Sequence, residues 1–287
     1  MSGPRSLAGK VALVTGASRG VGAATAVALA LDGCAVACAA RATAAQPLRL
    51  PGTIDDTVHR IKAQGGDALA VPTNLADESD VVRMVERTVA HYGRLDLLVN
   101  NAAITFVGDL TMPMKRYDLV MAVNVRAPFV AIREAAPHMR AVGGGSIVNI
   151  SSLAALVPIP GMAAYGMSKL ALEHLTLDAA RELEIDGTRV NCFRIDIAVA
   201  SEGFVANAPD ADHANWEPCE VAAEGILWML RQQLPYTGRR ESMHVLRDRE
   251  GIMASRVAAP AERKPLTLVA DGLPSAEEVS YIDVIDG

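Results

Sequence analysis

Tyr165 and Lys169 are the first residues of this sequence whose types and spacing suggest chemistry. They stand four positions apart in AYGMSKLAL, a stretch that is otherwise small and apolar, and in a helix this spacing puts both side chains on one face. A nearby ammonium favours the phenolate, so it would lower the pKa of a tyrosine from its usual value near 10 and suit it to proton transfer at neutral pH. Taken alone, a Tyr-x-x-x-Lys pair is more typical of an ordinary helix face.

Other polar residues gather where predicted strands end. They are Thr15-Gly16, Arg41, Asn74, Asn100-Asn101 and Ser151-Ser152. In an open parallel sheet, ligands bind beyond the carboxyl ends of the strands. We therefore expect a ligand site at this edge of the sheet.

The elements that would position these residues alternate between strand and helix. Buried, β-branched stretches predict six strands, at residues 10–16, 34–41, 68–75, 95–102, 145–152 and 188–196. Amphipathic or Ala-rich stretches between them predict helices, several of which end at glycine. This alternation predicts an α/β fold, a single-domain Rossmann-type doubly wound parallel sheet with helices on both faces. Aromatic residues make up only 4% of the chain, so the core must consist of Ala, Val, Leu and Ile, which suits a sheet covered on both sides.

A glycine-rich turn, TGASRGVG at residues 15–22, joins the first strand to the first helix. Gly16 permits the tight turn, Gly20 lets the backbone approach a phosphate, and Gly22 lets helix and strand pack closely. The helix N-terminus then offers free N–H groups to a pyrophosphate. The turn lacks Gly-Lys-Ser/Thr, so it is not the phosphate loop of an ATPase. A purely structural glycine turn is the alternative.

Several separate motifs together resemble the short-chain dehydrogenase/reductase family. They are TGASRGVG, NNAA at residues 100–103, the Asn of MAVNV at 121–125, SIVNISS at 146–152 and YGMSK at 165–169. The resemblance covers roughly residues 8–240. It implies an enzyme that transfers a hydride between a nicotinamide cofactor and a ketone, aldehyde or alcohol.

The resemblance also implies a role for each catalytic residue. Tyr165 would be the general acid/base, and Lys169 would hold the nicotinamide ribose hydroxyls and lower the pKa of Tyr165. Ser152 would orient the substrate oxygen, with Ser151 as the alternative serine. Asn124 would support a water relay to Lys169. The expected cofactor-binding residues are Gly16, Ser18, Arg19, Gly20, Val21, Gly22, Arg41, Asn74, Leu75, Asn101, Ala102, Ala103, Tyr165, Lys169 and Ile197.

The end of the second predicted strand indicates which dinucleotide would bind. An enzyme that uses NAD commonly has a carboxylate there for the ribose 2′-hydroxyl, whereas this chain reads Ala40-Arg41. The Arg41 guanidinium suits a 2′-phosphate, and Arg19 in the glycine turn offers a second cation. We therefore expect NADP(H) to be preferred over NAD(H). The alternative is that both arginines are solvated surface residues.

The chain departs from the family pattern after the sixth strand. The family usually has Pro-Gly there, and this chain has Ile195-Asp196. Asp196 is open to three interpretations: a substrate contact, a salt-bridge partner for Arg194, or harmless variation. NNAA in place of the family's NNAG is a milder departure.

The substrate class is suggested by residues 153–162, LAALVPIPGM, which are nearly all apolar. By resemblance this segment is the substrate loop, and a hydrophobic alcohol or ketone is the expected substrate. The segment is equally consistent with protein core. Two rival functions are a non-catalytic NADP(H)-binding redox sensor on the same fold and an enzyme acting on nucleotide sugars. The intact Ser/Tyr/Lys set argues against the first, and the short C-terminal part argues against the second.

Charge and composition exclude other classes of function. The net charge of −6 argues against a nucleic-acid partner. No segment has the roughly 18 apolar residues needed to span a bilayer, and the N-terminus lacks the pattern of a signal peptide. We expect a cytoplasmic protein without a membrane partner, acting on a small molecule as a homodimer or homotetramer, as the family commonly does. Four cysteines, without zinc spacing, indicate reduced thiols and no metal.

Two regions fit the alternating pattern less well. Residues 42–53 form a long loop after the second strand, and their prolines favour a shaped flap beside the adenosine end of a cofactor. After about residue 238 the alternation is lost. We therefore expect a catalytic domain at residues 1–240 and a C-terminal extension at 241–287. The apolar clusters of the extension predict that it packs on its own domain or on a neighbouring subunit.

Overall fold

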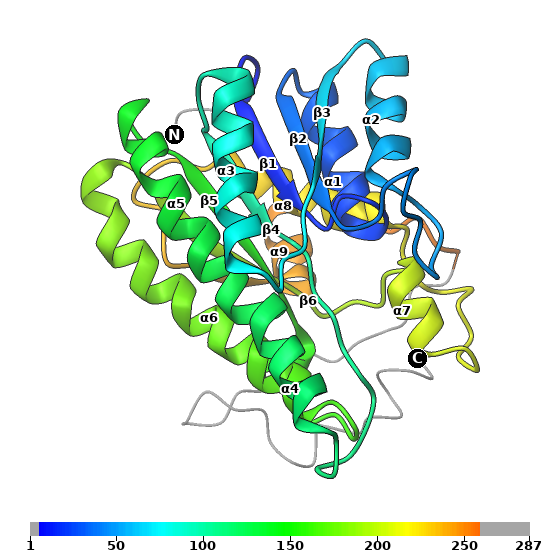
Figure 1. The fold of residues 1–287 in the computed structure, drawn as a ribbon. Helices are drawn as coiled ribbons and strands as arrows, with labels where there is room; N and C mark the ends of the chain where they lie inside the picture. The colour runs from blue at the N-terminus through cyan, green and yellow to red at the C-terminus, as the bar shows by residue number, and fades with distance from the viewer. Residues whose placement is uncertain (1–5, 259–287) are drawn as a thin grey trace.

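Seven parallel strands form the sheet at the centre of the structure (Figure 1). The computed structural model describes residues 6–258. The strands are β1 Val11–Thr15, β2 Ala35–Ala40, β3 Asp67–Pro72, β4 Leu97–Asn100, β5 Ser146–Ser152, β6 Arg189–Ile195 and β7 Arg240–Ser242. Their order across the sheet is β3-β2-β1-β4-β5-β6-β7, so the direction of winding reverses between β1 and β4. The predicted doubly wound fold is confirmed, and this reversal is where such folds bind dinucleotides.

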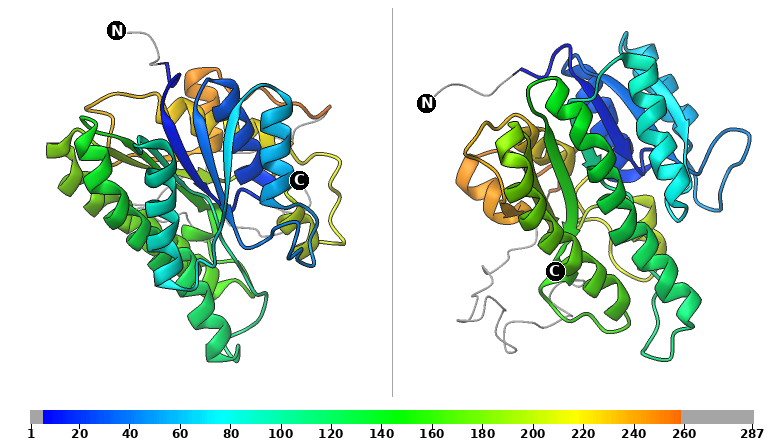
Figure 2. Two further views of the ribbon diagram at one scale, coloured as in Figure 1. Left: turned by 45° about the horizontal axis from the view of Figure 1, so that its top comes forward. Right: turned by 60° about the vertical axis from the view of Figure 1, so that its left-hand side comes forward.

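Helices cover both faces of the sheet, which Figure 2 shows from two further sides. They are α1 Gly20–Leu31, α2 Ile54–Ala63, α3 Glu78–Tyr92, α4 Met114–Met121, α5 Ala127–Ala141, α6 Ala163–Leu183, α7 Glu202–Asn207, α8 Cys219–Leu230 and α9 Met243–Glu250. One layer contains α1, α2 and α8, and the other contains α3, α5 and α6. A turn of π-helix, Ala122–Arg126, joins α4 to α5. None of the helices in residues 6–258 has both the length and the apolar character needed to cross a membrane.

The core consists of small aliphatic side chains in two clusters, one on each face of the sheet. All five residues of β1 are buried, as expected for a central strand covered by helices on both sides. Local signals fix the ends of the flanking helices. Thr53 and Asp56 form a capping box at the start of α2, and Gly93 ends α3 in the left-handed region with φ +74°.

The sheet continues past the predicted domain boundary at residue 240, which falls inside β7. β7 pairs with β6 in parallel, and α9 packs on α8 and β6. The first part of the predicted extension is thus integral to the domain. The rest, from residue 259, lies outside the described residues, and its packing stays a prediction.

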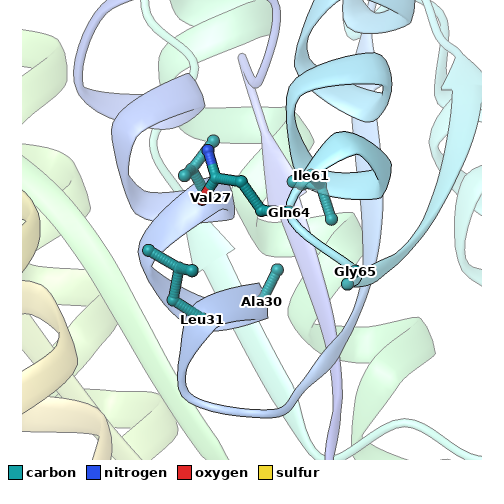
Figure 3. Close-up of a pocket in the computed structure, with 7 residues that line it drawn as sticks. Val27, Ala30, Leu31, Ile61, Gln64 and Gly65 are labelled. Atoms are coloured by element: carbon teal, nitrogen blue, oxygen red, sulfur yellow. The ribbon is translucent and has the colours of Figure 1, made fainter.

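A hollow of about 110 Å³ lies between α1 and α2 (Figure 3). Val27, Ala30 and Leu31 line it from the last turns of α1, and Ile61 and Gln64 line it from the end of α2. In a parallel α/β fold these helix ends lie at the amino ends of the strands. The hollow therefore faces away from the edge at which the predicted site residues gather.

Candidate active site

Tyr165 and Lys169 lie one turn apart near the start of α6. The Lys169 Nζ is 5.5 Å from the centroid of the Tyr165 ring. Lys169 is only 2% exposed, and its ammonium donates a hydrogen bond of 2.7 Å to the carbonyl oxygen of Ile150 on β5. α6 thus presents a half-buried phenol and a fully buried ammonium beyond the end of β5.

Burial sets the protonation of both groups. It lowers the pKa of Lys169 to about 8, because an ammonium away from water is disfavoured. It raises the pKa of Tyr165, and a hydrogen bond with Ser152 opposes that shift. We expected Lys169 to lower the pKa of Tyr165. Without a bound cofactor, desolvation of the phenolate has the largest effect, and the pKa of Tyr165 is raised. Tyr165 is a neutral phenol at neutral pH, the form that can donate a proton.

The two adjacent serines at the end of β5 have different partners. Ser152 hydrogen-bonds with Tyr165 and also accepts a hydrogen bond of 3.3 Å from the backbone N–H of Ala154. Ser151 is buried and donates its hydroxyl to Glu173 Oε1 at 2.8 Å. The structure therefore brings Ser152 to the phenol, while the alternative serine, Ser151, is engaged elsewhere.

Asn124 lies in the π-helical turn and is fully buried. Its Nδ2 donates to the Ile104 carbonyl oxygen at 2.9 Å and to Ser168 Oγ at 3.0 Å, and its Oδ1 accepts from the Ile104 N–H at 2.9 Å. Asn124 thus fixes the chain after β4 against the residue that precedes Lys169. These bonds reach the neighbour of Lys169 rather than its ammonium, so the water relay stays a prediction.

The glycine turn forms a cradle into which no side chain could be added. Gly16 and Gly20 have φ of +68° and +58°. A Cβ on Gly16 would lie 2.8 Å from Asn101 Nδ2, and one on Gly22 would lie 2.3 Å from the Gly16 carbonyl oxygen. No side chain caps the start of α1, and its first turn holds no acidic residue. Free N–H groups behind a glycine-only surface fit a pyrophosphate.

Thr15, Asn101 and Ala102 lock this cradle to the end of β4. The backbone N–H groups of Asn101 and Ala102 both donate to Thr15 Oγ1 at 3.1 Å. Asn101 Nδ2 donates to the Thr15 carbonyl oxygen at 3.0 Å. The NNAA motif therefore fixes the shape of the glycine turn, across the point where the strand order reverses.

Arg19 is engaged by the loop at residues 42–53. Its Nε donates to the Pro51 carbonyl oxygen at 2.6 Å, and one terminal nitrogen donates to the carbonyl oxygens of Leu50 and Gly52 at 2.8 and 3.0 Å. Burial lowers the pKa of Arg19; a nearby carboxylate opposes this shift and the Arg41 guanidinium adds to it. The loop is thus a shaped flap beside the glycine turn. Arg19 holds it in place, and Arg41 stays exposed nearby.

The remaining expected cofactor contacts lie around the same edge. Ser18 and Val21 are buried in the glycine turn, and Leu75 is buried after β3. Asn74 is exposed, and its Oδ1 accepts a hydrogen bond of 3.3 Å from the Ala76 N–H. The other two are Ala103, exposed after β4, and Ile197, half-buried after β6.

Asp196 contacts the start of α9. Its carboxylate accepts hydrogen bonds from the Ser242 hydroxyl and from the His244 N–H, the latter at 3.1 Å. Ser242 in turn caps α9. Arg194 makes its two hydrogen bonds with Glu173, and the charge of Asp196 also favours the Arg194 cation. In place of the family's glycine, this chain has a residue that ties β6 to β7 and α9.

The apolar segment at residues 153–162 is divided between core and surface. Leu153, Ala154, Ala155 and Val157 are buried, whereas the segment's prolines are exposed. Gly161 lies against the loop that follows β4, and its carbonyl oxygen accepts a hydrogen bond of 3.0 Å from the Gly108 N–H. That loop and the start of α4 expose Val107, Leu110 and Met114. Exposed apolar side chains therefore lie on the loop that contacts the 153–162 segment.

Glu173 is a site residue that sequence reasoning missed. It lies four residues after Lys169, on the same face of α6, and is fully buried. The signal was available: Tyr165, Lys169 and Glu173 recur at intervals of four. An acidic residue at that spacing on a buried face requires a partner, and Arg194 is that partner.

Comparison with known proteins places this geometry in a family. Residues 10–201 match the family described as short chain dehydrogenase. The chain is 39% identical over 207 residues to a 3-oxoacyl-acyl-carrier-protein reductase, FabG, from Staphylococcus aureus, covering 70% of this chain and 77% of that protein. It is 31% identical over 273 residues to hydroxysteroid dehydrogenase-like protein 2 from Danio rerio, covering 93% of this chain and 65% of that protein.

A solved structure has a similar fold. A short chain dehydrogenase from Burkholderia cenocepacia in complex with NADP has 33% sequence identity and a TM-score of 0.73, covering 83% of this chain and 97% of that one. The family match extends over most of the sheet, from β1 to the residues after β6. The chain therefore belongs to the short-chain dehydrogenase/reductase family.

Proposed function

We propose that this protein is an NADP(H)-dependent oxidoreductase that interconverts a hydrophobic ketone or aldehyde and the corresponding alcohol. The observation that carries the proposal is the grouping of Ser152, Tyr165 and Lys169 at the edge of the sheet that also holds the glycine cradle. A redox sensor that only binds the cofactor has no need of a phenol hydrogen-bonded to a serine beside a buried ammonium.

Each side chain has a distinct task in this proposal. A nicotinamide cofactor, when bound, supplies or accepts the hydride. Tyr165 donates its phenolic proton to the carbonyl oxygen during reduction, a role open to a phenol that keeps its proton at neutral pH. Ser152 orients that oxygen by a hydrogen bond. Lys169 holds the ribose hydroxyls. Its positive charge also stabilises the phenolate that forms when Tyr165 loses its proton.

The preference for NADP(H) is proposed on the end of β2. Arg41 stands there exposed, where an enzyme using NAD commonly has a carboxylate. Arg19 holds the loop at residues 42–53, which begins directly after Arg41, through three hydrogen bonds to backbone carbonyl oxygens. The similar structure in complex with NADP supports the same preference.

The substrate proposal combines exposed apolar side chains with the relatives. Val107, Leu110 and Met114 are exposed on and after the loop that contacts the 153–162 segment, and such side chains favour an apolar substrate body. The S. aureus relative is named as a reductase of a 3-oxoacyl chain on a carrier protein. A 3-oxoacyl thioester is therefore one hydrophobic ketone that this chain could reduce, beside aliphatic, aromatic, terpenoid and steroid ketones.

The test is the oxidation of NADPH by the purified full-length protein with a panel of these carbonyl compounds. Turnover of at least one hydrophobic ketone, with a higher kcat/KM for NADPH than for NADH, is expected. Binding of NADPH without turnover of any carbonyl compound would favour the redox sensor instead. Equal or better kcat/KM with NADH would overturn the cofactor preference alone.

A further inference from the structure

Three side chains on one face of α6 recur at intervals of four: Tyr165, Lys169 and Glu173. The first two belong to the proposed site, and the third lies a turn deeper in the protein and is 0% exposed. The Glu173 carboxylate has four polar contacts. Arg194 donates to both of its oxygens at 2.8 and 2.6 Å, Ser151 Oγ donates at 2.8 Å, and Arg240 Nη1 lies 3.8 Å away.

Few other groups around Lys169 could stabilise the positive charge of its buried ammonium. From α6 it faces Tyr165 and Glu173, from β5 only the carbonyl of Ile150, and from β6 the thiol of Cys192. Burial raises the pKa of that thiol to about 12, so it is neutral at working pH. The cations Arg194 and Arg240 pair with Glu173. Within residues 6–258, Glu173 is the one carboxylate that acts on Lys169.

We propose that Glu173 is a positioning residue that keeps the Lys169 ammonium protonated, with Arg194 and Ser151 fixing its carboxylate in place. This inference rests on the proposed function, in which Lys169 acts as a cation. A buried ammonium with a single carbonyl acceptor loses its proton readily. A fixed negative charge one turn away opposes that loss, because charges interact strongly where water is excluded.

A purely structural role explains less of the arrangement. An ion pair between α6 and β6 contributes little stability compared with well-packed apolar side chains of the same volume. The place of the pair distinguishes the two accounts. Its carboxylate lies one turn after Lys169 on α6, and it accepts a hydrogen bond from Ser151, the residue next to Ser152.

The experiment measures the dissociation constant of NADPH from about pH 6 to about pH 10, by cofactor fluorescence, in the full-length protein and its variants. Lys169→Met identifies the part of the profile that depends on the ammonium. Glu173→Gln removes the negative charge and keeps the shape. Asp96→Asn is the matched control: Asp96 is an equally buried carboxylate with Lys10 and Arg94 as partners, before the amino end of β4.

In the wild type, NADPH affinity should fall on the alkaline side as Lys169 loses its proton, and Lys169→Met should lack that fall. In Glu173→Gln the midpoint of the fall should move down by about one pH unit, a tenfold loss of proton affinity. Asp96→Asn should keep the wild-type midpoint. Should Glu173→Gln fail to fold, the double variant Glu173→Gln/Arg194→Gln removes both members of the buried ion pair, and its midpoint should also move down.

The outcomes separate the inference from the function on which it rests. If the alkaline fall is present and is abolished by Lys169→Met, but keeps its midpoint in Glu173→Gln or in the folded double variant, the role of Glu173 is wrong and the proposed function stands. An equal shift in Asp96→Asn overturns the role of Glu173 in the same way. If the wild type does not bind NADPH, or Lys169→Met keeps the fall, the proposed role of Lys169 fails first.

Discussion

The protonation state of Tyr165 follows from a competition between burial and its neighbours, and burial has the larger effect. We expect Tyr165→Phe to lower turnover of the best ketone about 10²–10⁴-fold, the usual loss for a general acid. The ring is kept, so NADPH should still bind within a few-fold of the wild-type affinity. Steady-state rates and a fluorescence titration measure the two quantities. A variant that turns over at nearly the wild-type rate would remove Tyr165 from the mechanism.

Arg41 is the side chain on which cofactor preference should depend, because Arg19 already makes three hydrogen bonds to the flap. Arg41→Asp should lower kcat/KM for NADPH about 10- to 100-fold, the loss of a charge-assisted hydrogen bond or more. It should leave kcat/KM for NADH unchanged or higher. Arg60→Asp makes the same change of charge on the exposed face of α2 and should alter neither. An equal effect of both variants would indicate a general change of charge.

Side chains differed in how far the sequence could predict them. Tyr165 and Lys169 are four residues apart, and helix geometry is enough to bring them together. Arg19 and Asp196 find their partners at residues 50–52 and 242–244. Such partners are set by tertiary packing and leave no local pattern. The expectation for Arg19 therefore took its charge into account and missed the carbonyl groups that bind it.

Strands and helices could be predicted where the local sequence alone determines their structure. Strands β1 to β6 carry apolar runs, which are mostly buried in every strand except β3, and all six were predicted. β7 has three residues, and its pairing with β6 defines it as a strand. The glycines that end α3 or permit the turn before α1 also have a local reason to be glycine.

The junction of β1 and α1 gives a test in which local propensity and packing predict opposite results. Alanine in a helix is favoured over glycine by roughly 1 kcal/mol, so Gly22→Ala would stabilise α1 by propensity alone. The added Cβ would lie 2.3 Å from the Gly16 carbonyl oxygen, and such overpacking costs about 1–3 kcal/mol. We expect a lower melting temperature and weaker NADPH binding.

Gly203→Ala in α7 is the control for this test, because nothing lies within 4 Å of its added Cβ. Thermal unfolding with and without NADPH measures both variants. If Gly22→Ala melts above the wild type, propensity outweighs packing, and the close approach of α1 to the turn is not what Gly22 permits.

On the surface of the molecule, α5 and α6 run side by side, visible in Figures 1 and 2. A groove between α4, α5 and α6 contains Met121, Phe129 and Leu175, and Phe129 is 52% exposed. Leu170 is exposed on the same helix as Leu175. An apolar surface of this kind favours association, so we predict that a second copy of the chain covers it.

The double variant Phe129→Glu/Leu170→Glu should therefore lower the mass measured by light scattering from that of a dimer or tetramer to that of a monomer. Leu31→Glu, at an exposed leucine in the other helix layer, should keep the wild-type mass. A wild type that is already monomeric at micromolar concentration would refute the prediction, as would a double variant that keeps its assembly.

The reversal of strand order between β1 and β4 divides the site between two halves of one sheet. The glycine cradle comes from the first half, and Ser152, Tyr165 and Lys169 come from the second. A dinucleotide that spans both acts as a clasp, and a ligand bound only by the native state adds about 2.7 kcal/mol to its stability at a hundredfold excess over the dissociation constant. Because only the native state brings the two halves together, unfolding should release the dinucleotide. Resistance of the protein to limited proteolysis should therefore increase with the concentration of cofactor.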